Sequence, residues 1–140
     1  MPKPKIVLDT NIILSSIFPT SPYELILRSV ANEQYDMYVS TPILLEYEEK
    51  INDIFGVKTA KLFIDFCKKT PNVKNTEIYY NWRMIYADPD DDKFVDCSIA
   101  ANADFLVTND KHFNILKGIQ FPHLKVLKIN DFMNFLSQDK

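Results

Sequence analysis

Among the 19 Asp and Glu residues of this 140-residue chain, those at four separate places could combine into one site. One follows an apolar run near the N-terminus, one lies in the first half of the chain, five fall within nine consecutive positions, and one follows a second apolar run. These residues are Asp9, Glu46, the group Asp88, Asp90, Asp91, Asp92 and Asp96, and Asp110. If folding brings the four places together, they form a strongly negative site.

Several carboxylates at one site repel one another and do not all ionise without compensating positive charge. No Arg or Lys is an evident partner on the short apolar runs, so a divalent cation is the economical compensation. Oxygen ligands suit Mg²⁺ or Mn²⁺, whereas zinc would favour His and Cys. Mg²⁺ joins carboxylates to substrate phosphates, which favours phosphodiester hydrolysis by a metal-activated water, with the metal charge stabilising the leaving oxygen.

Hydrophobic patterning predicts strands that alternate with helices. We expect strands at 5–9, 35–39, 104–108 and 124–129, and helices at 23–32, from 41 or 42 onward, at 57–68, 91–102 and 110–116. A last helix is expected to be capped by Asn130 or Asp131 and to run through 136. Residues 70–87 are less clear, with a short extended piece at 78–86. No linker or internal repeat is visible, so residues 1–140 are expected to form a single domain.

Such alternation predicts an α/β fold, with a central parallel sheet covered on both faces. Ligands of these sheets bind beyond the carboxyl ends of the strands, near the point where the strand order reverses. Asp9 ends the first strand, and Asp110 follows the third. Glu46 lies near the start of the helix after the second strand, and Asp91 lies in the first turn of the helix before the third. All four are therefore expected at one edge of the sheet.

Helical spacing selects only partly among these acids. In a helix that starts at Asp91, this residue falls on the apolar face at about 100° per residue, whereas Asp92 lies near the edge of that face and Asp96 further off. Asp91 is therefore the best candidate ligand of its group, with Asp92 and Asp96 as alternatives. In the earlier helix, Glu46 lies no closer to the apolar stripe than Glu48, so periodicity does not choose between them.

Four segments, in this order, resemble the PIN domain (PilT N-terminus-like), most closely the bacterial and archaeal branch of toxin-type ribonucleases. They are VLDTNI (7–12), LLEYEEK (44–50), DPDDDKFVDCSIA (88–100) and ADFLVTNDKHF (103–113). The resemblance runs from about Lys5 to Phe113, and the combination of segments is specific. It implies a three-layer α/β/α sandwich around the parallel sheet.

By position, the resemblance implies catalytic and metal-binding roles for four acids and supporting hydrogen bonds from two polar residues. The acids are Asp9, Glu46, Asp91 and Asp110, with Asp92 and Asp96 as weaker matches, and the supporting residues are Asn11 and Thr108. The implied activity is that of an endoribonuclease that cleaves single-stranded RNA with Mg²⁺ or Mn²⁺. The implied partners are an antitoxin protein and further copies of the chain, in a dimer or tetramer.

Composition excludes several other classes. Gly56 and Gly118 are the only glycines, which rules out a P-loop or a dinucleotide-binding fingerprint. No apolar run reaches the roughly 18 residues of a membrane span, and the N-terminus lacks the pattern of a signal peptide. Cys67 and Cys97 have no metal or redox spacing, so we expect a reduced, cytoplasmic compartment. The net charge of −3 on its own argues against nucleic-acid binding. Without the clustered acids, however, the remaining surface would be near-neutral or mildly basic.

Two other functions compete with the nuclease. A catalytically degenerate PIN domain would bind RNA or protein without cutting, and the presence of all four acids disfavours it. A phosphotransfer enzyme or receiver domain has a similar build. Asn11 stands where a haloacid-dehalogenase-type phosphatase needs its second Asp, and Asp9 lacks the adjacent acid of a receiver.

Other residues that could act on RNA are expected to have structural roles. His112 and His123 are expected at the surface or in packing rather than in catalysis. Tyr79, Tyr80 and Trp82 could stack on RNA bases, but we expect core or interface roles for them.

Overall fold

The computed structural model describes residues 3–18, 20–85, 89–118 and 124–138. Within these ranges the strands form one sheet of five, in the order β3-β2-β1-β4-β5, and every pairing is parallel. The elements are β1 (Lys5–Leu8), α1 (Thr10–Ser16), α2 (Glu24–Ala31), β2 (Asp36–Val39), α3 (Thr41–Phe55), α4 (Val57–Lys69), β3 (Val73–Asn75), the 3₁₀ turn η1 (Pro89–Asp91), α5 (Asp92–Ala100), β4 (Phe105–Val107), the 3₁₀ segment η2 (Lys111–Gly118), β5 (Val126–Leu127) and α6 (Ile129–Gln138).

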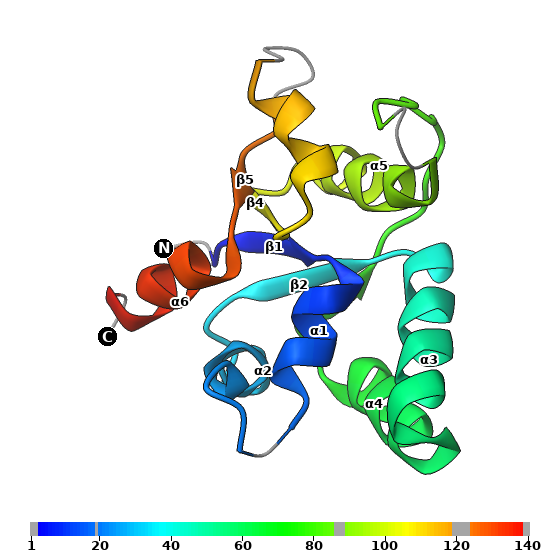
Figure 1. The fold of residues 1–140 in the computed structure, drawn as a ribbon, viewed down its shortest axis with the longest axis vertical. Coiled ribbons are helices and arrows are strands. Elements are labelled where there is room, and N and C mark those ends of the chain that lie inside the picture. Colours follow the sequence, from blue (N-terminus) through cyan, green and yellow to red (C-terminus); the bar gives the residue numbers. More distant parts are fainter. Residues whose placement is uncertain (1–2, 19, 86–88, 119–123, 139–140) are drawn as a thin grey trace.

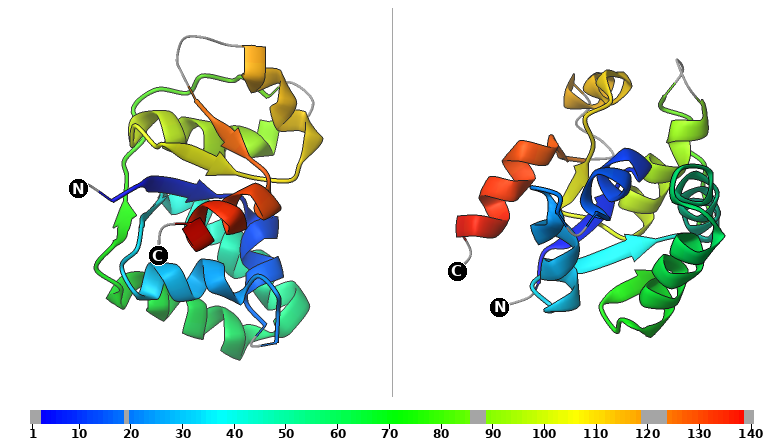
Figure 2. Two further views of the ribbon diagram at one scale, coloured as in Figure 1. Left: turned by 90° about the vertical axis from the view of Figure 1, so that its left-hand side faces the viewer. Right: turned by 60° about the horizontal axis from the view of Figure 1, so that its bottom comes forward.

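Helices cover both faces of this sheet. Figures 1 and 2 show α5 on one side of the strands and α1, α2 and α4 on the other. α5 packs against β1 and β4, α2 packs against α6, and α3 lies along α4 while it also contacts α1 and α5. The predicted α/β sandwich with a central parallel sheet is therefore confirmed. Among the described residues, no helix has both the length and the apolar character that crossing a membrane requires.

β1 is the central strand, and its sequence reflects this position. Ile6, Val7 and Leu8 are all fully buried, as expected for a strand with helices on both faces. Both cysteines, Cys67 on α4 and Cys97 on α5, are free thiols buried within the same core. The sheet core thus consists of apolar side chains and reduced sulfur.

Three elements differ from the expectation. α1 was not predicted, because its run of isoleucines after Asp-Thr-Asn has low helix propensity; Ile12 and Ile13 are fully buried, which stabilises this short helix through packing. The short extended piece expected at 78–86 forms no strand over residues 78–85, and Tyr86 lies outside the described residues. The edge strand of this region is β3, which pairs with β2.

The last helix also begins earlier than expected. α6 starts at Ile129, whose backbone N–H donates a 3.0 Å hydrogen bond to Oδ1 of Asn109. Asn130 and Asp131 therefore lie inside its first turn rather than before it. The side chain of Asn109, distant in sequence, thus accepts a hydrogen bond from the first N–H of α6, a contact that local capping patterns do not reveal.

The strand order reverses between β1 and β4. From β1 the chain crosses to β2 and β3 on one side, and it later returns to β4 and β5 on the other. The two central strands are joined beyond their ladder by a 3.0 Å hydrogen bond from the Asp9 N–H to the Val107 carbonyl. The carboxyl ends of β1 and β4 therefore flank the crevice in which parallel sheets bind ligands.

Candidate metal centre

Asp9 lies at this crevice, directly after β1. Its backbone carbonyl accepts the N–H groups of Ile12 and Ile13, so the chain turns from the strand into α1 at this residue. Its side chain is buried, and Oδ2 accepts a 2.7 Å hydrogen bond from the hydroxyl of Thr108, which directly follows β4. The carboxylate is therefore held between the two strands that flank the crevice.

Several neighbours act on the ionisation of Asp9. Burial is the largest effect and raises its pKa, since the charged form loses hydration. Hydrogen bonds from the Thr108 hydroxyl and the Thr10 backbone lower the pKa, whereas the negative charges of Glu46 and Asp110 raise it. The net pKa lies above the ordinary value, and the contributions of Glu46 and Asp110 show that three of the predicted acids share one electrostatic environment.

Glu46 is positioned by its own helix and by α1. The next residue, Tyr47, is fully buried, and its hydroxyl donates a hydrogen bond to the Leu8 carbonyl at the end of β1. This contact fixes α3 against the sheet beside Asp9. Oε2 of Glu46 then accepts a hydrogen bond from the Thr10 hydroxyl.

A lysine that the sequence analysis did not single out is the second partner of Glu46. Nζ of Lys93, on the first turn of α5, lies 2.7 Å from Oε1 of Glu46 and 2.6 Å from the carbonyl of Asp90. The Lys93 and Glu46 side chains are only about one-fifth exposed. The available signal was a single cation directly after the acidic run; its reach to Glu46 depends on the packing of α3 against α5.

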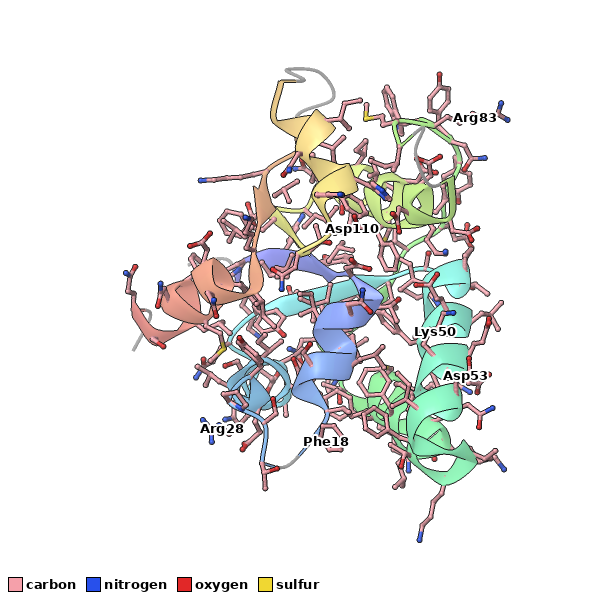
Figure 3. All side chains as sticks on the ribbon, viewed as in Figure 1. Phe18, Arg28, Lys50, Asp53, Arg83 and Asp110 are labelled. Atoms are coloured by element: carbon pink, nitrogen blue, oxygen red, sulfur yellow. The ribbon has the colours of Figure 1, made fainter. Side chains whose placement is uncertain are left out.

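Asp91, Asp110 and His112 form the other half of the centre. Nδ1 of His112 lies 3.4 Å from Oδ1 of Asp110 and 3.6 Å from Oδ2 of Asp91. One ligand atom from each of the three residues lies within 4.8 Å of the others. Figure 3 shows Asp110 where the chain leaves β4, above the N-terminal end of α1. His112, expected to be a surface or packing residue, therefore lies against two of the predicted ligands.

Asp92 and Asp96, the weaker matches among the predicted metal ligands, face a different part of the chain. Oδ1 of Asp92 accepts a 2.7 Å hydrogen bond from the Ile85 N–H, and Oδ1 of Asp96 accepts one of 2.9 Å from the Trp82 N–H. They point the same way because they are four positions apart on α5, which starts at Asp92 and leaves Asp91 in the preceding 3₁₀ turn. Burial raises the pKa of Asp96, and the charge of Asp92 adds to that rise.

The remaining candidates also have defined positions. Asn11 is exposed on α1, and within the described part of the chain its side chain makes no hydrogen bond; Thr10 makes the supporting contact instead, to Glu46. Tyr79 and Tyr80 are 87% and 65% exposed, so the expectation of a core role is wrong for both. Asp88 and His123 lie outside the described residues.

The donor set fits a divalent cation. Carboxylate oxygens come from the residue after β1, from α3, from η1 and from the loop after β4. The proximity of like charges at Asp9 is relieved when positive charge binds. Oxygen-rich sites of this kind suit Mg²⁺ and Mn²⁺. The residues that would hold the ion are Asp9, Glu46, Asp91 and Asp110.

Comparison with known proteins agrees with the fold and with this chemistry. Residues 5–112 match the family model of the PIN domain, so the chain belongs to the PIN-domain family. Members of this family are generally nucleases and generally use divalent metal ions. No match to the chain is found among curated proteins.

Solved structures with the same fold have low sequence identity to this chain. VapBC2 from Rickettsia felis, bound to a DNA fragment from its promoter, is 18% identical over 89% of this chain and 98% of the other, with a TM-score of 0.58. DNA-bound VapBC from Salmonella typhimurium is 15% identical over 92% and 99%, with a TM-score of 0.60. FitAcB from Neisseria gonorrhoeae is 16% identical over 89% and 97%, with a TM-score of 0.55.

Proposed function

We propose that this protein is an endoribonuclease that cleaves single-stranded RNA with Mg²⁺ or Mn²⁺ held by Asp9, Glu46, Asp91 and Asp110. The observation that carries the proposal is the buried carboxylate of Asp9 at the crevice between β1 and β4, with Glu46 and Asp110 close enough to raise its pKa. A site that gathers negative charge in this way favours binding of a doubly charged cation.

The side chains of the protein have distinct tasks in this proposal. A divalent cation would supply the positive charge that activates water and stabilises the leaving oxygen of a phosphodiester. Thr108 holds Asp9 in place, and Thr10 holds Glu46, so both carboxylates are oriented before any ligand binds. Lys93 supplies a second positive charge at the edge of the site, where it can attract the phosphate groups of RNA.

A groove next to Lys93 offers a path for the substrate. The lining of a pocket of about 290 Å³ includes the cations of Arg83 and Lys93, the polar side chains of Ser40 and Asn81, and the carboxylates of Asp92 and Asp96. A second pocket shares Ser40 and Asn81 with the first and extends to Tyr79. The exposed ring of Tyr79 in the second pocket and the cations of the first suit an unpaired base and its phosphates, which supports a single-stranded substrate.

The proposal extends to protein partners. The sequence resemblance to toxins of toxin–antitoxin pairs, together with the fold shared with VapBC and FitAcB structures, supports an antitoxin protein as a partner. Large apolar side chains exposed on α3 and α4 are available for an antitoxin or for a second copy of the chain. They are Leu45, Ile54, Val57 and Leu62.

One observation favours a second candidate, a PIN domain that binds RNA without cutting it. Both carboxylate oxygens of Glu46 are occupied, one by the Thr10 hydroxyl and the other by the Lys93 ammonium. In a degenerate site this lysine would permanently replace the cation. In the nuclease, Lys93 and the metal ion must both interact with Glu46.

Cleavage of a fluorescent single-stranded RNA distinguishes the two candidates. The purified chain, free of antitoxin, is titrated with Mg²⁺ and Mn²⁺ alongside Asp9→Asn, with circular dichroism to verify folding. We expect metal-dependent cleavage by the natural chain and at least a hundredfold lower rate for the variant, since one charged ligand is lost. Intact RNA at every metal concentration, with folded protein, would contradict the nuclease. RNA binding of equal affinity in both proteins would then support the second candidate.

A further inference from the structure

His112 is held at the metal centre by its own backbone. Its N–H donates a 2.9 Å hydrogen bond to Oδ1 of Asp110, and it lies near the start of η2. This bond places the imidazole directly beside the Asp110 carboxylate. Oδ2 of Asp91, from the turn before α5, lies 3.6 Å from Nδ1 of the same ring.

Nδ1 of His112 makes no hydrogen bond to any described residue, although the atom is buried. Its separations of 3.4 Å from Asp110 and 3.6 Å from Asp91 are longer than ordinary N–H···O hydrogen bonds. Neighbouring ligands of an octahedral cation with bonds of about 2.1–2.5 Å lie roughly 3.0–3.5 Å apart. Nδ1 of His112 is therefore separated from both carboxylates by about the distance between neighbouring ligands of one ion, and the three donor atoms all lie within 4.8 Å of one another.

We propose that His112 binds the divalent cation through Nδ1, together with Asp91 and Asp110, and that this nitrogen shifts the preference of the centre from Mg²⁺ to a transition-metal ion such as Mn²⁺. The inference rests on the proposed metal-dependent function and specifies the ion. Imidazole nitrogen is a softer donor than carboxylate oxygen, and it favours first-row transition metals over Mg²⁺. An all-carboxylate centre would lack this preference.

Pulsed electron paramagnetic resonance of the Mn²⁺-loaded full chain tests the assignment directly. A nitrogen bound to Mn²⁺ produces ¹⁴N modulation of the electron spin echo, and oxygen ligands do not. The chain contains two histidines, so His112→Gln is compared with the matched control His123→Gln. Glutamine at position 112 keeps the backbone N–H that bonds to Asp110.

We expect ¹⁴N modulation in the natural chain and in His123→Gln, and its loss in His112→Gln. Titration calorimetry should show that the ratio of Mn²⁺ to Mg²⁺ affinity falls about tenfold in His112→Gln, since loss of one ligand weakens Mn²⁺ binding more than Mg²⁺ binding. Mn²⁺ bound without ¹⁴N modulation in the natural chain, or modulation that persists in His112→Gln, would overturn the role of His112 alone. Failure of the natural chain to bind either ion would overturn the proposed function as well.

Discussion

The hydroxyl of Thr108 donates a 2.7 Å hydrogen bond to Oδ2 of Asp9, although the two residues are 99 positions apart in the chain. Oγ1 of Thr108 also accepts the backbone N–H of Asp110 at 3.0 Å. One buried hydroxyl therefore connects the acid after β1 to the acid after β4. The relative placement of these two carboxylates depends on the pairing of the strands that carry them.

Substitution of Thr108 tests this connection. In Thr108→Val the Asp9 carboxylate loses a donor that lowers its pKa, and the Asp110 N–H loses its acceptor, so we expect Mn²⁺ affinity to fall about tenfold or more. The free energy of unfolding should fall by about 1–3 kcal/mol. Calorimetric titration and urea denaturation measure the two effects. Thr108→Ser keeps the hydroxyl and is the control; equal affinities in the two variants would show that the hydroxyl has no such role.

Lys93 provides a second prediction. Because its ammonium and the bound cation both interact with Glu46, Lys93→Met should bind Mn²⁺ about three to ten times more tightly once the competing positive charge is gone. Without metal, the same variant leaves Glu46 without its cation partner, and its melting temperature should fall. The rise in melting temperature on adding Mn²⁺ should therefore be larger for Lys93→Met than for the natural chain. Lys93→Arg keeps the charge, and a rise as large as that of Lys93→Met would argue against competition.

Asp96 gives a pH-dependent prediction that separates it from the metal ligands. Burial raises the pKa of Asp96 in the folded state. The protonated side chain therefore stabilises the fold at pH values below 3.8, the pKa of Asp in the unfolded chain. This stabilisation is lost as the pH rises through the folded-state pKa. Asp96→Asn keeps an acceptor for the Trp82 N–H but cannot ionise. Its free energy of unfolding, relative to that of the natural chain, should increase between pH 3 and pH 7.

The matched variant Asp96→Ala removes the acceptor. It should unfold with a free energy about 1–3 kcal/mol lower than Asp96→Asn, because the Trp82 N–H loses its partner. Both variants should bind Mn²⁺ within about threefold of the natural affinity, since the carboxylate faces residues 82–85. A tenfold loss of affinity in Asp96→Asn would instead make Asp96 a metal ligand.

Tyr79 tests the path proposed for RNA. The ring is 87% exposed and lines the groove that continues toward Lys93, so Tyr79→Ser should weaken binding of single-stranded RNA by about fivefold or more through lost stacking. Tyr79→Phe keeps the ring and should bind as the natural chain does. Fluorescence anisotropy with Ca²⁺ as the divalent ion measures the RNA affinities, and cleavage is followed in a separate experiment. Equal binding by the Ser and Phe variants would place the RNA elsewhere.

Much of the fold could be predicted because its elements carry strong local patterns. Ile6, Val7 and Leu8 form an uninterrupted apolar run that predicts a doubly covered strand, and the structure buries all three. The Gly56 position separates α3 from α4, with a φ of 95° that suits glycine. The order of strands and helices then indicates a parallel sheet and the edge at which the acids should lie.

Features that depend on tertiary contacts could not be predicted. α1 is stabilised by the burial of Ile12 and Ile13 rather than by helix propensity, and α6 is capped by Asn109, 20 residues before the N–H that it accepts. The positions of Lys93 and His112 at the centre follow from the packing of α5 and η2 around the carboxyl end of the sheet. No local spacing rule relates Lys93 to Glu46, or His112 to Asp91.

A crystal structure of the chain grown with Mn²⁺, with anomalous diffraction recorded to locate the ion, tests the central claim most directly. We expect one anomalous peak at the carboxyl ends of β1 and β4, with oxygens from Asp9, Glu46, Asp91 or Asp110 within about 2.0–2.6 Å, directly or through bound water. Peaks only at surface carboxylates away from Asp9, with the crevice filled by water and the Lys93–Glu46 ion pair intact, would contradict the claim.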